Sequence, residues 1–382
     1  MTTEQKKILF ISAPVGAGHV RAAQAVANAL QEVDPAIRTQ QANVFDFFHP
    51  SLGQGILKLY LKLLATFPQA YGTMYGWGND SSLALFGRRQ VSRYLAKKMQ
   101  RYILNYNPSA IVCTHATPAG LIAYLHRHSG LQVPTFAIVT DFVVHRLWVY
   151  PEISRYYVAD ETLRDFLDQQ GIASERSRAF GIPVDASFSM NVTRNAILQR
   201  LNLPTDGKNI LIMGGGAGIL PMAEILIACD RLDAPVRFIA VTGNNHKLYN
   251  ELSALAKRLA HPVRILGFVN NVHELMSCAD ILLSKPGGMT SAEALACGLP
   301  MIIFQPIPGQ EEANTRFLVE RNYALRADTI ESVKMNLQRL LSASSQELEN
   351  LRCNVAKAGK GLAAKDIAQN IILTTRNWKA NS

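Results

Sequence analysis

Residues 281–314 constrain the fold more strongly than any other segment of the sequence. They contain two apolar strands, 281–283 and 301–304, which are separated by a glycine turn and a short alanine-rich helix. Two strands joined by a helix form a βαβ unit, whose strands pair in parallel. A parallel sheet binds ligands at the carboxyl ends of its strands, which is where the glycine turn and the loop after residue 304 lie.

The residues around this glycine turn are those that a nucleotide-sugar site needs. Gly287 and Gly288 let the backbone approach a diphosphate closely, and the N–H groups of the following helix favour that anion. Glu293 can accept hydrogen bonds from ribose hydroxyls, and Gln310 and Glu311 can bind those of a hexose. The alternative is an ordinary βαβ unit with a glycine turn, which does not explain these side chains at these offsets.

A second glycine loop follows the predicted strand 8–12. It reads Gly16-Ala17-Gly18-His19, but Arg21 replaces the third glycine of a dinucleotide fingerprint, so a nicotinamide site is rejected. His19 is expected at the N-terminus of the next helix, where the helix dipole disfavours the imidazolium and keeps the ring able to accept a proton. A histidine that only caps the helix is the alternative.

These segments resemble the monogalactosyldiacylglycerol synthase and processive diacylglycerol glucosyltransferase group of glycosyltransferase family 28. The resemblance extends over residues 6–375, and Ala17 departs from it, because many members have asparagine or glycine there. The most specific segments are Gly16-Ala17-Gly18-His19, 134–142, 145–149, 181–183, 214–216 and 286–314.

Strand and helix patterns alternate along the chain, which predicts an α/β fold with doubly wound parallel sheets. The predicted strands are 8–12, 110–113, 135–140, 155–158, 178–180, 209–213, 236–241, 263–266, 281–283 and 301–304. The chain restarts after a hinge at 181–184, which predicts an N-terminal acceptor- and membrane-binding domain, 1–182, and a C-terminal UDP-sugar-binding domain, 183–363. The resemblance implies the GT-B architecture, in which two Rossmann-like domains face each other across a cleft. It also implies that the C-terminal helix, 364–382, packs back on the first domain.

The cysteines and the hydropathy pattern indicate the cellular compartment in which the protein is expected. The five cysteines show no paired spacing and no C-x-x-C, which argues against a disulfide framework and against a zinc site. No signal-peptide pattern is visible, and the most apolar window, 210–229, is interrupted by glycine, proline and Glu224. The expectation is a peripheral protein on the cytoplasmic face of the cell membrane.

Residues 45–101 combine aromatic side chains with a run of cations. Nine of the thirty aromatic residues, Trp77 among them, lie between 45 and 86, and residues 88–101 hold six cations and no acid. The cations that recur every four residues on one helical stripe are Arg89, Arg93, Lys97 and Arg101. This combination is typical of an interfacial membrane site, where each cation adds about 1 kcal/mol on an anionic surface. A partly buried subdomain with a solvated basic face is the alternative.

The net charge of +10 also fits nucleic-acid binding, but the pattern of residues argues against it. No zinc-finger spacing and no arginine-rich arm is present, and the aromatic residues cluster with aliphatic ones instead of alternating with basic ones. Nucleic acid is therefore not expected as a partner.

Together, the residues and the resemblance predict an inverting hexosyltransferase that moves glucose or galactose from a UDP-sugar to diacylglycerol. His19 is the expected base, and Asp141 is its competitor or the residue that orients it. No Asp-x-Asp motif lies in a suitable loop, so no cofactor and no obligatory metal are expected. Two alternatives stay open: another lipid acceptor, such as a polyprenyl-linked sugar or a sphingolipid-like base, and a UDP-sugar sensor without catalysis.

The expected contacts divide between donor and acceptor. The donor residues are Gly215, Gly216, Gly287, Gly288, Thr290 and Ser291 for the diphosphate, Glu293 for the ribose, and Gln310, Glu311 and Asn314 for the sugar. The resemblance places uracil against the backbone near Phe268. On the acceptor side we expect Gly18, His145 and Trp148, although a packing role explains Trp148 equally well.

Overall fold

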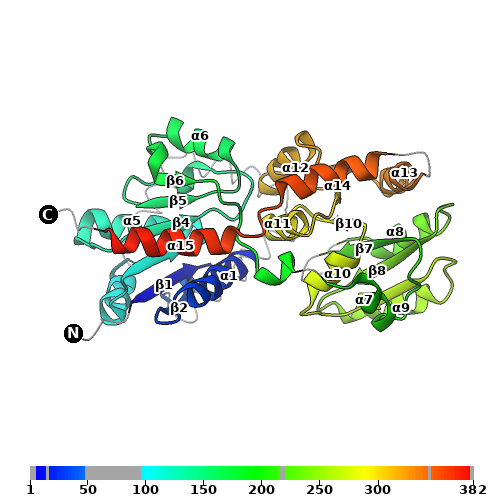
Figure 1. The fold of residues 1–382 in the computed structure, drawn as a ribbon, viewed down its shortest axis with the longest axis horizontal. Coiled ribbons are helices and arrows are strands. Elements are labelled where there is room, and N and C mark those ends of the chain that lie inside the picture. The colour runs from blue at the N-terminus through cyan, green and yellow to red at the C-terminus, as the bar shows by residue number, and fades with distance from the viewer. Residues whose placement is uncertain are drawn as a thin grey trace. The chain divides into compact units, whose positions relative to one another are not determined.

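The computed structural model describes residues 6–13, 17–47, 96–190, 192–214, 220–342 and 346–378. The chain divides into two compact units, whose elements are labelled in Figure 1. The first unit comprises Met1–Asp185, Ile307–Gln310 and Leu362–Ser382, and the second comprises Ala186–Pro306 and Glu311–Gly361. The C-terminal segment therefore belongs with the N-terminal half of the chain.

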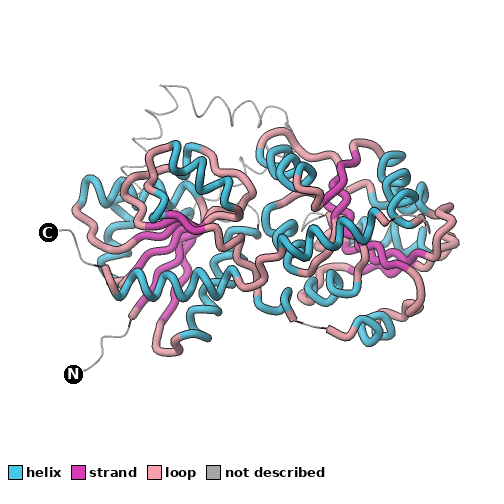
Figure 2. Tube along the Cα trace, turned by 45° about the horizontal axis from the view of Figure 1, so that its top comes forward, coloured by secondary structure: helices cyan, strands magenta, loops and turns pink. Residues whose placement is uncertain are grey.

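The first unit contains a six-stranded sheet in which every pairing is parallel. In spatial order the strands are β2 (Arg38–Asn43), β1 (Lys7–Ser12), β3 (Ala110–Cys113), β4 (Thr135–Ile138), β5 (Arg155–Tyr157) and β6 (Ser177–Arg178). Its helices include α1 (Gly18–Val33), α5 (Ala116–Ser129), α6 (Glu161–Gln169) and α15 (Ala363–Arg376). Figure 2 shows the strands as one sheet with helices around it, which explains why β3 and β4 are buried along their whole length.

The C-terminal helix α15 lies beside α1, as Figure 1 shows, and shares one apolar core with it. Leu30 of α1 and Ile371 of α15 are both fully buried in that core. Polar contacts add to the packing: Arg155 Nη1 on β5 donates to Asn370 Oδ1 at 2.7 Å, and the Tyr157 hydroxyl donates to the same oxygen at 3.0 Å. The helix is thus held by a strand more than two hundred residues away in sequence.

The second unit repeats the architecture with another all-parallel sheet. In spatial order the strands are β12 (Ala324–Ala327), β11 (Met301–Phe304), β10 (Ile281–Ser284), β7 (Lys208–Met213), β8 (Val236–Val241) and β9 (Val263–Leu266). The helices are α7 (Arg194–Arg200), α8 (Met222–Cys229), α9 (His246–Ala256), α10 (Val272–Cys278), α11 (Gly288–Ala296), α12 (Gln310–Glu320), α13 (Ile330–Leu341) and α14 (Glu347–Ala358). Each unit is a doubly wound, Rossmann-like domain, which confirms the predicted fold class.

Each strand predicted from the sequence is present, but two further strands were missed. These are β2 and β12, and each is an edge strand of its sheet. An edge strand is buried less completely, so its residues lack the apolar run that marks a central strand; β2, for example, reads RTQQAN. The predicted strand 135–140 was also too long, because β4 ends at Ile138 and the next residues form a loop.

Both sheets reverse their strand order at one point, and that point positions the candidate site. In the first sheet the chain leaves β1 for β2 and returns on the other side as β3. In the second sheet it leaves β7 for β8 and β9 and returns beside β7 as β10. Ligands of such sheets bind where the order reverses, outside the carboxyl ends of the strands.

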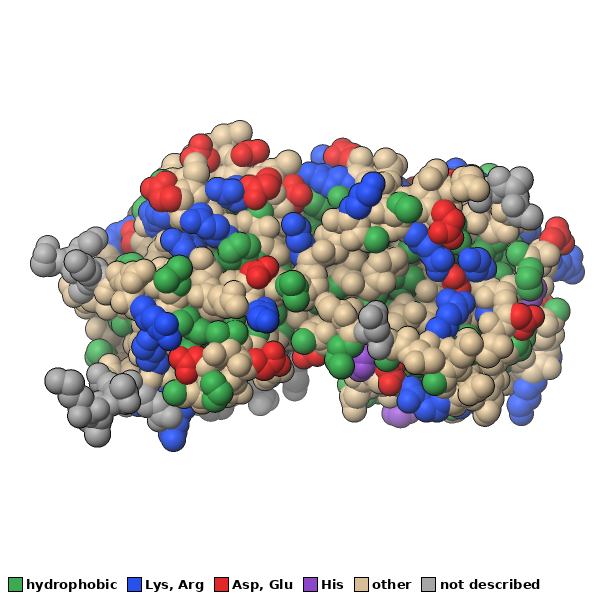
Figure 3. Space-filling model, in the orientation of Figure 1, with side chains coloured by type: hydrophobic (Ala, Val, Ile, Leu, Met, Phe, Trp, Pro, Cys, Tyr) green, Lys and Arg blue, Asp and Glu red, His purple; other side chains and the backbone are tan. Residues whose placement is uncertain are grey.

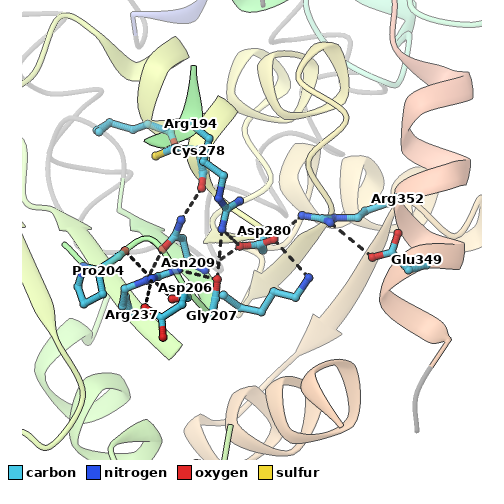
Figure 4. Close-up of polar contacts among 12 residues, drawn as sticks. Arg194, Pro204, Asp206, Gly207, Asn209, Arg237, Cys278, Asp280, Glu349 and Arg352 are labelled. Atoms are coloured by element: carbon cyan, nitrogen blue, oxygen red, sulfur yellow. Dashed lines mark hydrogen bonds and ion pairs between the residues drawn. The ribbon is translucent and has the colours of Figure 1, made fainter. Parts of the chain in front are cut away.

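The opposite edge of the second sheet is held by one carboxylate, Asp280, at the amino end of β10. Its side chain is 3% exposed and lies among cations from three elements, as Figure 4 shows. Asp280 Oδ2 accepts from Arg194 Nη2 and from the Asn209 N–H, both at 2.7 Å, and Oδ1 accepts from Arg352 Nη2 at 2.5 Å. Lys208 Nζ lies 3.6 Å away. Burial by itself raises the pKa of this carboxyl, but Arg194, the Asn209 N–H and Arg352 outweigh it and lower the pKa.

We expect Asp280→Asn to destabilise the second unit by about 3 kcal/mol, because the arginines that share this buried carboxylate would both lose its negative charge. The three cations are partly exposed, so we expect the lower end of the usual cost of breaking a buried ion pair. Urea unfolding, combined with hydrogen exchange of β7 and β10, measures the effect and localises it.

The effect depends on pH, because the pKa of Asp280 is lowered in the folded state. Its contribution is present above the unfolded pKa and is lost as the pH falls through the folded pKa. The difference in the free energy of unfolding between wild type and Asp280→Asn therefore becomes smaller at acidic pH. Glu161→Gln, which breaks an exposed pair with Arg164, serves as the control and changes stability by less than about 1 kcal/mol. Equal stability of Asp280→Asn and wild type at neutral pH would contradict the role of this carboxylate.

Candidate active site

In the first unit, His19 lies in the first turn of α1, beside the carboxyl end of β3. Its Nδ1 is 2.9 Å from the carbonyl oxygen of Thr114 and 2.7 Å from Thr140 Oγ1. A carbonyl oxygen can only accept, so Nδ1 carries the ring hydrogen and Nε2 keeps its lone pair. His19 is thus held in the tautomer in which Nε2 is free to accept a proton.

The surroundings of His19 also keep the ring uncharged. Burial lowers the pKa of His19 below its ordinary value, although Asp141 and the Thr114 carbonyl act in the opposite direction. Asp141 is 8% exposed and follows Thr140 in the loop after β4. The two predicted catalytic residues, His19 and Asp141, are therefore close enough for the charge of one to affect the other.

Two further histidines lie nearby, His115 against His19 and His145 near His115, and only His145 was predicted. His115 packs edge-on against His19, with ring centroids 4.8 Å apart and planes at 88°. It is the N-cap of α5, and its Nδ1 accepts from the Thr117 N–H at 3.1 Å. His145 caps the short 3₁₀ helix η2 (Arg146–Trp148) in the same way, accepting from the Leu147 N–H at 3.1 Å.

The other acceptor-side predictions have different outcomes. Gly18 is the first residue of α1 and is half-buried next to His19. Trp148 is only 3% exposed, and its carbonyl accepts from the Tyr156 hydroxyl at 3.0 Å, so the structure supports packing for this residue.

In the second unit, Gly287 is the N-cap of α11 and lies three residues beyond the end of β10. Its backbone has φ −64° and ψ 138°, a conformation open to any residue, and a Cβ built there would meet no atom within 4 Å. Neither the backbone nor internal packing therefore requires glycine at this position. The open space in front of the helix N-terminus, with Gly288 as the first helical residue, suits an anion that approaches the backbone.

The side chains that follow the turn lie on the inner face of α11. Ser291 is fully buried, and among the described residues its hydroxyl has no hydrogen-bond partner. Glu293 is 1% exposed, whereas Thr290 is half-buried. A buried hydroxyl and a buried carboxylate so close to a helix N-terminus are polar groups that a bound ligand can satisfy.

Asn314 has a role that the sequence did not predict. It is 1% exposed on α12, and its Nδ2 donates to the carbonyl oxygen of Pro286 at 3.1 Å. The amide therefore fixes the glycine turn against α12, and the contact of Asn314 with the sugar stays a prediction. Gln310 and Glu311, the first residues of α12, are half-buried.

The remaining donor-side predictions are Phe268 and the glycine loop after β7. Phe268, in the loop after β9, is 65% exposed, so an apolar ring is presented to solvent near the carboxyl end of a strand. Gly215 and Gly216 lie outside the described residues, as do Arg89, Arg93 and Trp77 of the predicted membrane segment.

Sequence reasoning missed two residues with charge or proton chemistry, His115 and Lys285. Lys285 follows β10 directly, and its Nζ donates to the carbonyl oxygen of Gln305. Burial lowers the pKa of Lys285, while nearby Glu311 acts to raise it. His115 lies two residues beyond the buried strand β3, and Lys285 directly follows the buried strand β10. This position at the carboxyl end of a strand could have identified both residues from the sequence.

No group of three or more histidine, cysteine or acidic side chains within the described ranges is placed to hold a metal ion. Likewise, none of the helices in the described part of the chain has both the length and the apolar character needed to cross a membrane.

Comparisons with known proteins match both halves of the chain. Residues 19–184 match the monogalactosyldiacylglycerol (MGDG) synthase family, and residues 209–371 match the glycosyltransferase family 28 C-terminal domain. The processive diacylglycerol beta-glucosyltransferase of Bacillus pumilus (strain SAFR-032) is 30% identical over 370 residues, which cover 96% of this chain and 94% of that protein. The protein of the same name from Bacillus subtilis (strain 168) is 29% identical over 375 residues, covering 96% and 95%.

Solved structures agree on the fold. MurG of Acinetobacter baumannii superposes with a TM-score of 0.64 at 16% identity, covering 96% of this chain and 99% of that chain. A UDP-glucosyltransferase from Polygonum tinctorium superposes with a TM-score of 0.65 at 13% identity, covering 99% and 100%. These likenesses support the GT-B fold with two Rossmann-like domains.

Proposed function

This chain belongs to the monogalactosyldiacylglycerol synthase group of glycosyltransferase family 28, and we propose that it transfers a hexose from a UDP-sugar to diacylglycerol to make a membrane glycolipid. The observation that carries the proposal is the similarity, over nearly the whole chain, to a processive diacylglycerol beta-glucosyltransferase. The geometry of each unit adds the chemistry that such a transfer needs.

In the proposed reaction, the acceptor hydroxyl attacks the anomeric carbon as UDP leaves, in one step that inverts the configuration. A lipid hydroxyl is a poor nucleophile, and a base that removes its proton in the transition state lowers the barrier. His19 suits this role, because its Nε2 has a lone pair and its pKa is lowered by burial. Asp141 favours the imidazolium that forms, so it would stabilise the charge that His19 gains.

The second unit would bind the donor and stabilise the departing diphosphate. The N–H groups at the start of α11 and the Ser291 hydroxyl are donors for the phosphate oxygens. Glu293 would accept from the ribose hydroxyls, and Gln310 and Glu311 would bind the sugar. No metal cofactor is part of this proposal, because backbone N–H groups and hydroxyls supply the stabilisation.

We also propose that the first unit docks peripherally on the cytoplasmic face of the membrane. Residues 96–106 are helical, with Met99 and Ile103 buried, and with Lys97, Lys98 and Arg101 exposed. Leu104, 64% exposed, adds an apolar side chain to this exposed face. On the face of the molecule that Figure 3 shows, lysine and arginine side chains are interspersed with acidic ones, so net charge alone does not identify the docking face.

The transfer itself is tested by supplying labelled UDP-glucose and UDP-galactose separately, with diacylglycerol vesicles and EDTA, and identifying the lipid product by mass spectrometry. We expect labelled glycolipid from the wild type, and a loss of kcat by a factor of about 10² to 10⁴ in His19→Ala, because the base is gone. Binding of UDP is expected to persist in that variant, since the residues proposed to bind its diphosphate and ribose, 287–293, belong to the other unit.

Asp141→Asn is the matched variant for the choice of base. If His19→Ala keeps most of its kcat while Asp141→Asn loses it, Asp141 is the base. Binding of UDP without any labelled lipid would identify a sensor. Labelled product that forms only with a polyprenyl-linked sugar or a sphingolipid-like base would show that this lipid, and not diacylglycerol, is the acceptor.

We expect Glu293→Ala to weaken the binding of the donor, because its ribose loses a hydrogen-bond acceptor. A charge-assisted hydrogen bond contributes about 1.5–3 kcal/mol, so the Kd for UDP rises at least about tenfold. Calorimetry with UDP and 2′-deoxy-UDP isolates the contact: the wild type distinguishes the two ligands, and Glu293→Ala does not. If the variant still distinguishes the two ligands, Glu293 does not bind the ribose 2′-hydroxyl. Thermal unfolding is measured alongside, because the side chain is buried.

We expect the double variant Lys97→Glu, Arg101→Glu to bind anionic vesicles at least about thirtyfold more weakly, because two cations that each contribute about 1 kcal/mol are lost. Co-sedimentation with neutral and anionic vesicles at low and high salt measures this, and salt weakens the binding of the wild type. The control is Lys257→Glu, Arg258→Glu, which makes the same charge change at the end of α9 in the second unit. Equal binding of wild type to neutral and anionic vesicles would contradict the electrostatic account.

A further inference from the structure

His115 is a half-buried ring that packs against His19, and it has no role in the reaction proposed above. It lies between β3 and α5 with extended backbone, φ −143° and ψ 148°, and its Nδ1 accepts from the Thr117 N–H. An acceptor nitrogen has no hydrogen, so in the neutral ring the hydrogen lies on Nε2. His115 therefore has the opposite tautomer to His19, whose Nδ1 carries the hydrogen.

Helix capping also holds His115 uncharged. A proton on Nδ1 would remove the acceptor that satisfies an N–H group in the first turn of α5, where a positive charge is unfavourable as well. Burial, with smaller contributions from His19 and His145, lowers the pKa of His115 to about 3. The ring beside His19 is thus neutral across the pH range in which enzymes work.

We propose that His115 is a positioning residue for His19: its neutral ring, packed edge-on at 4.8 Å, keeps water from one side of the base and holds the base against Thr114. The inference rests on the proposed function, in which His19 takes the acceptor proton. A ring that is fixed by a backbone N–H cannot turn away, so the contact is built into the start of α5.

The consequence for His19 follows from the groups that act on it. These come from separate elements: Asp141 lies in the loop after β4, Thr114 directly follows β3, and His115 is the N-cap of α5. His145, the N-cap of η2, acts on His115 in turn. Burial is the strongest influence and lowers the pKa of His19. Replacing His115 by a smaller side chain admits water, while Asp141 continues to favour the imidazolium, so the pKa of His19 rises.

The test is His115→Asn, because asparagine retains an N-cap acceptor for α5 but removes the ring. Histidine side chains labelled with carbon-13 are titrated by NMR in the full-length protein, and the His19 resonance is assigned with His19→Asn. We expect His19 to titrate at higher pH in His115→Asn than in the wild type. The acid limb of kcat/KM moves in the same direction, giving a several-fold loss of activity in acid that recovers at alkaline pH.

His128→Asn is the matched control, since His128 is an exposed histidine in the last turn of the same helix. It leaves the titration of His19 unchanged. An unchanged His19 titration in His115→Asn, with activity reduced equally at every pH, would show a merely structural role and overturn the proposal. A shifted titration without a shifted acid limb would support the positioning role and remove His19 as the base. Should His115→Asn fail to fold, His115→Ser, which also caps a helix, replaces it in the same experiment.

Discussion

Parallel strand pairing is the constraint on which both halves of the structure depend. When every strand runs in the same direction, every loop that leaves a carboxyl end emerges at the same edge of the sheet. His19 after β1, His115 after β3 and Asp141 after β4 are therefore neighbours although the chain separates them widely. The same geometry in the second sheet places the turn at Gly287 near the end of β7, because β10 pairs with β7.

The two edges of the second sheet have different tasks. At the amino edge, Asp280 accepts hydrogen bonds from a backbone N–H and from arginines of α7 and α14, so charges there are satisfied within the protein. At the carboxyl edge, the turn before α11 has no side-chain cap, and the Ser291 hydroxyl has no partner among the described residues. A fold that satisfies one edge internally can leave polar groups at the other edge for a ligand.

The histidines of the first unit show how backbone groups assign chemistry to identical side chains. A carbonyl oxygen at Nδ1 leaves His19 with a basic Nε2, whereas a backbone N–H at Nδ1 leaves His115 with an Nε2 that donates. Both rings are kept neutral by burial, yet only His19 is close enough to Asp141 for that carboxylate to favour its charged form. These contacts give the two neighbouring rings opposite tautomers, and only the tautomer of His19 leaves Nε2 able to accept a proton.

The sequence by itself determined the parallel α/β fold, the central strands of both sheets and the positions of His19 and Glu293. Those features depend on local patterns, namely apolar runs, glycine turns and the first turns of helices. Only the tertiary structure decided that Asn314 holds Pro286, that Trp148 is buried, that β2 and β12 are edge strands and that His115 contacts His19. The tautomer of His19, for example, depends on Thr114 and Thr140, which lie 95 and 121 residues away in sequence. A residue's environment is set by the strands that pair beside it, and a local pattern does not contain the order in which distant strands pair.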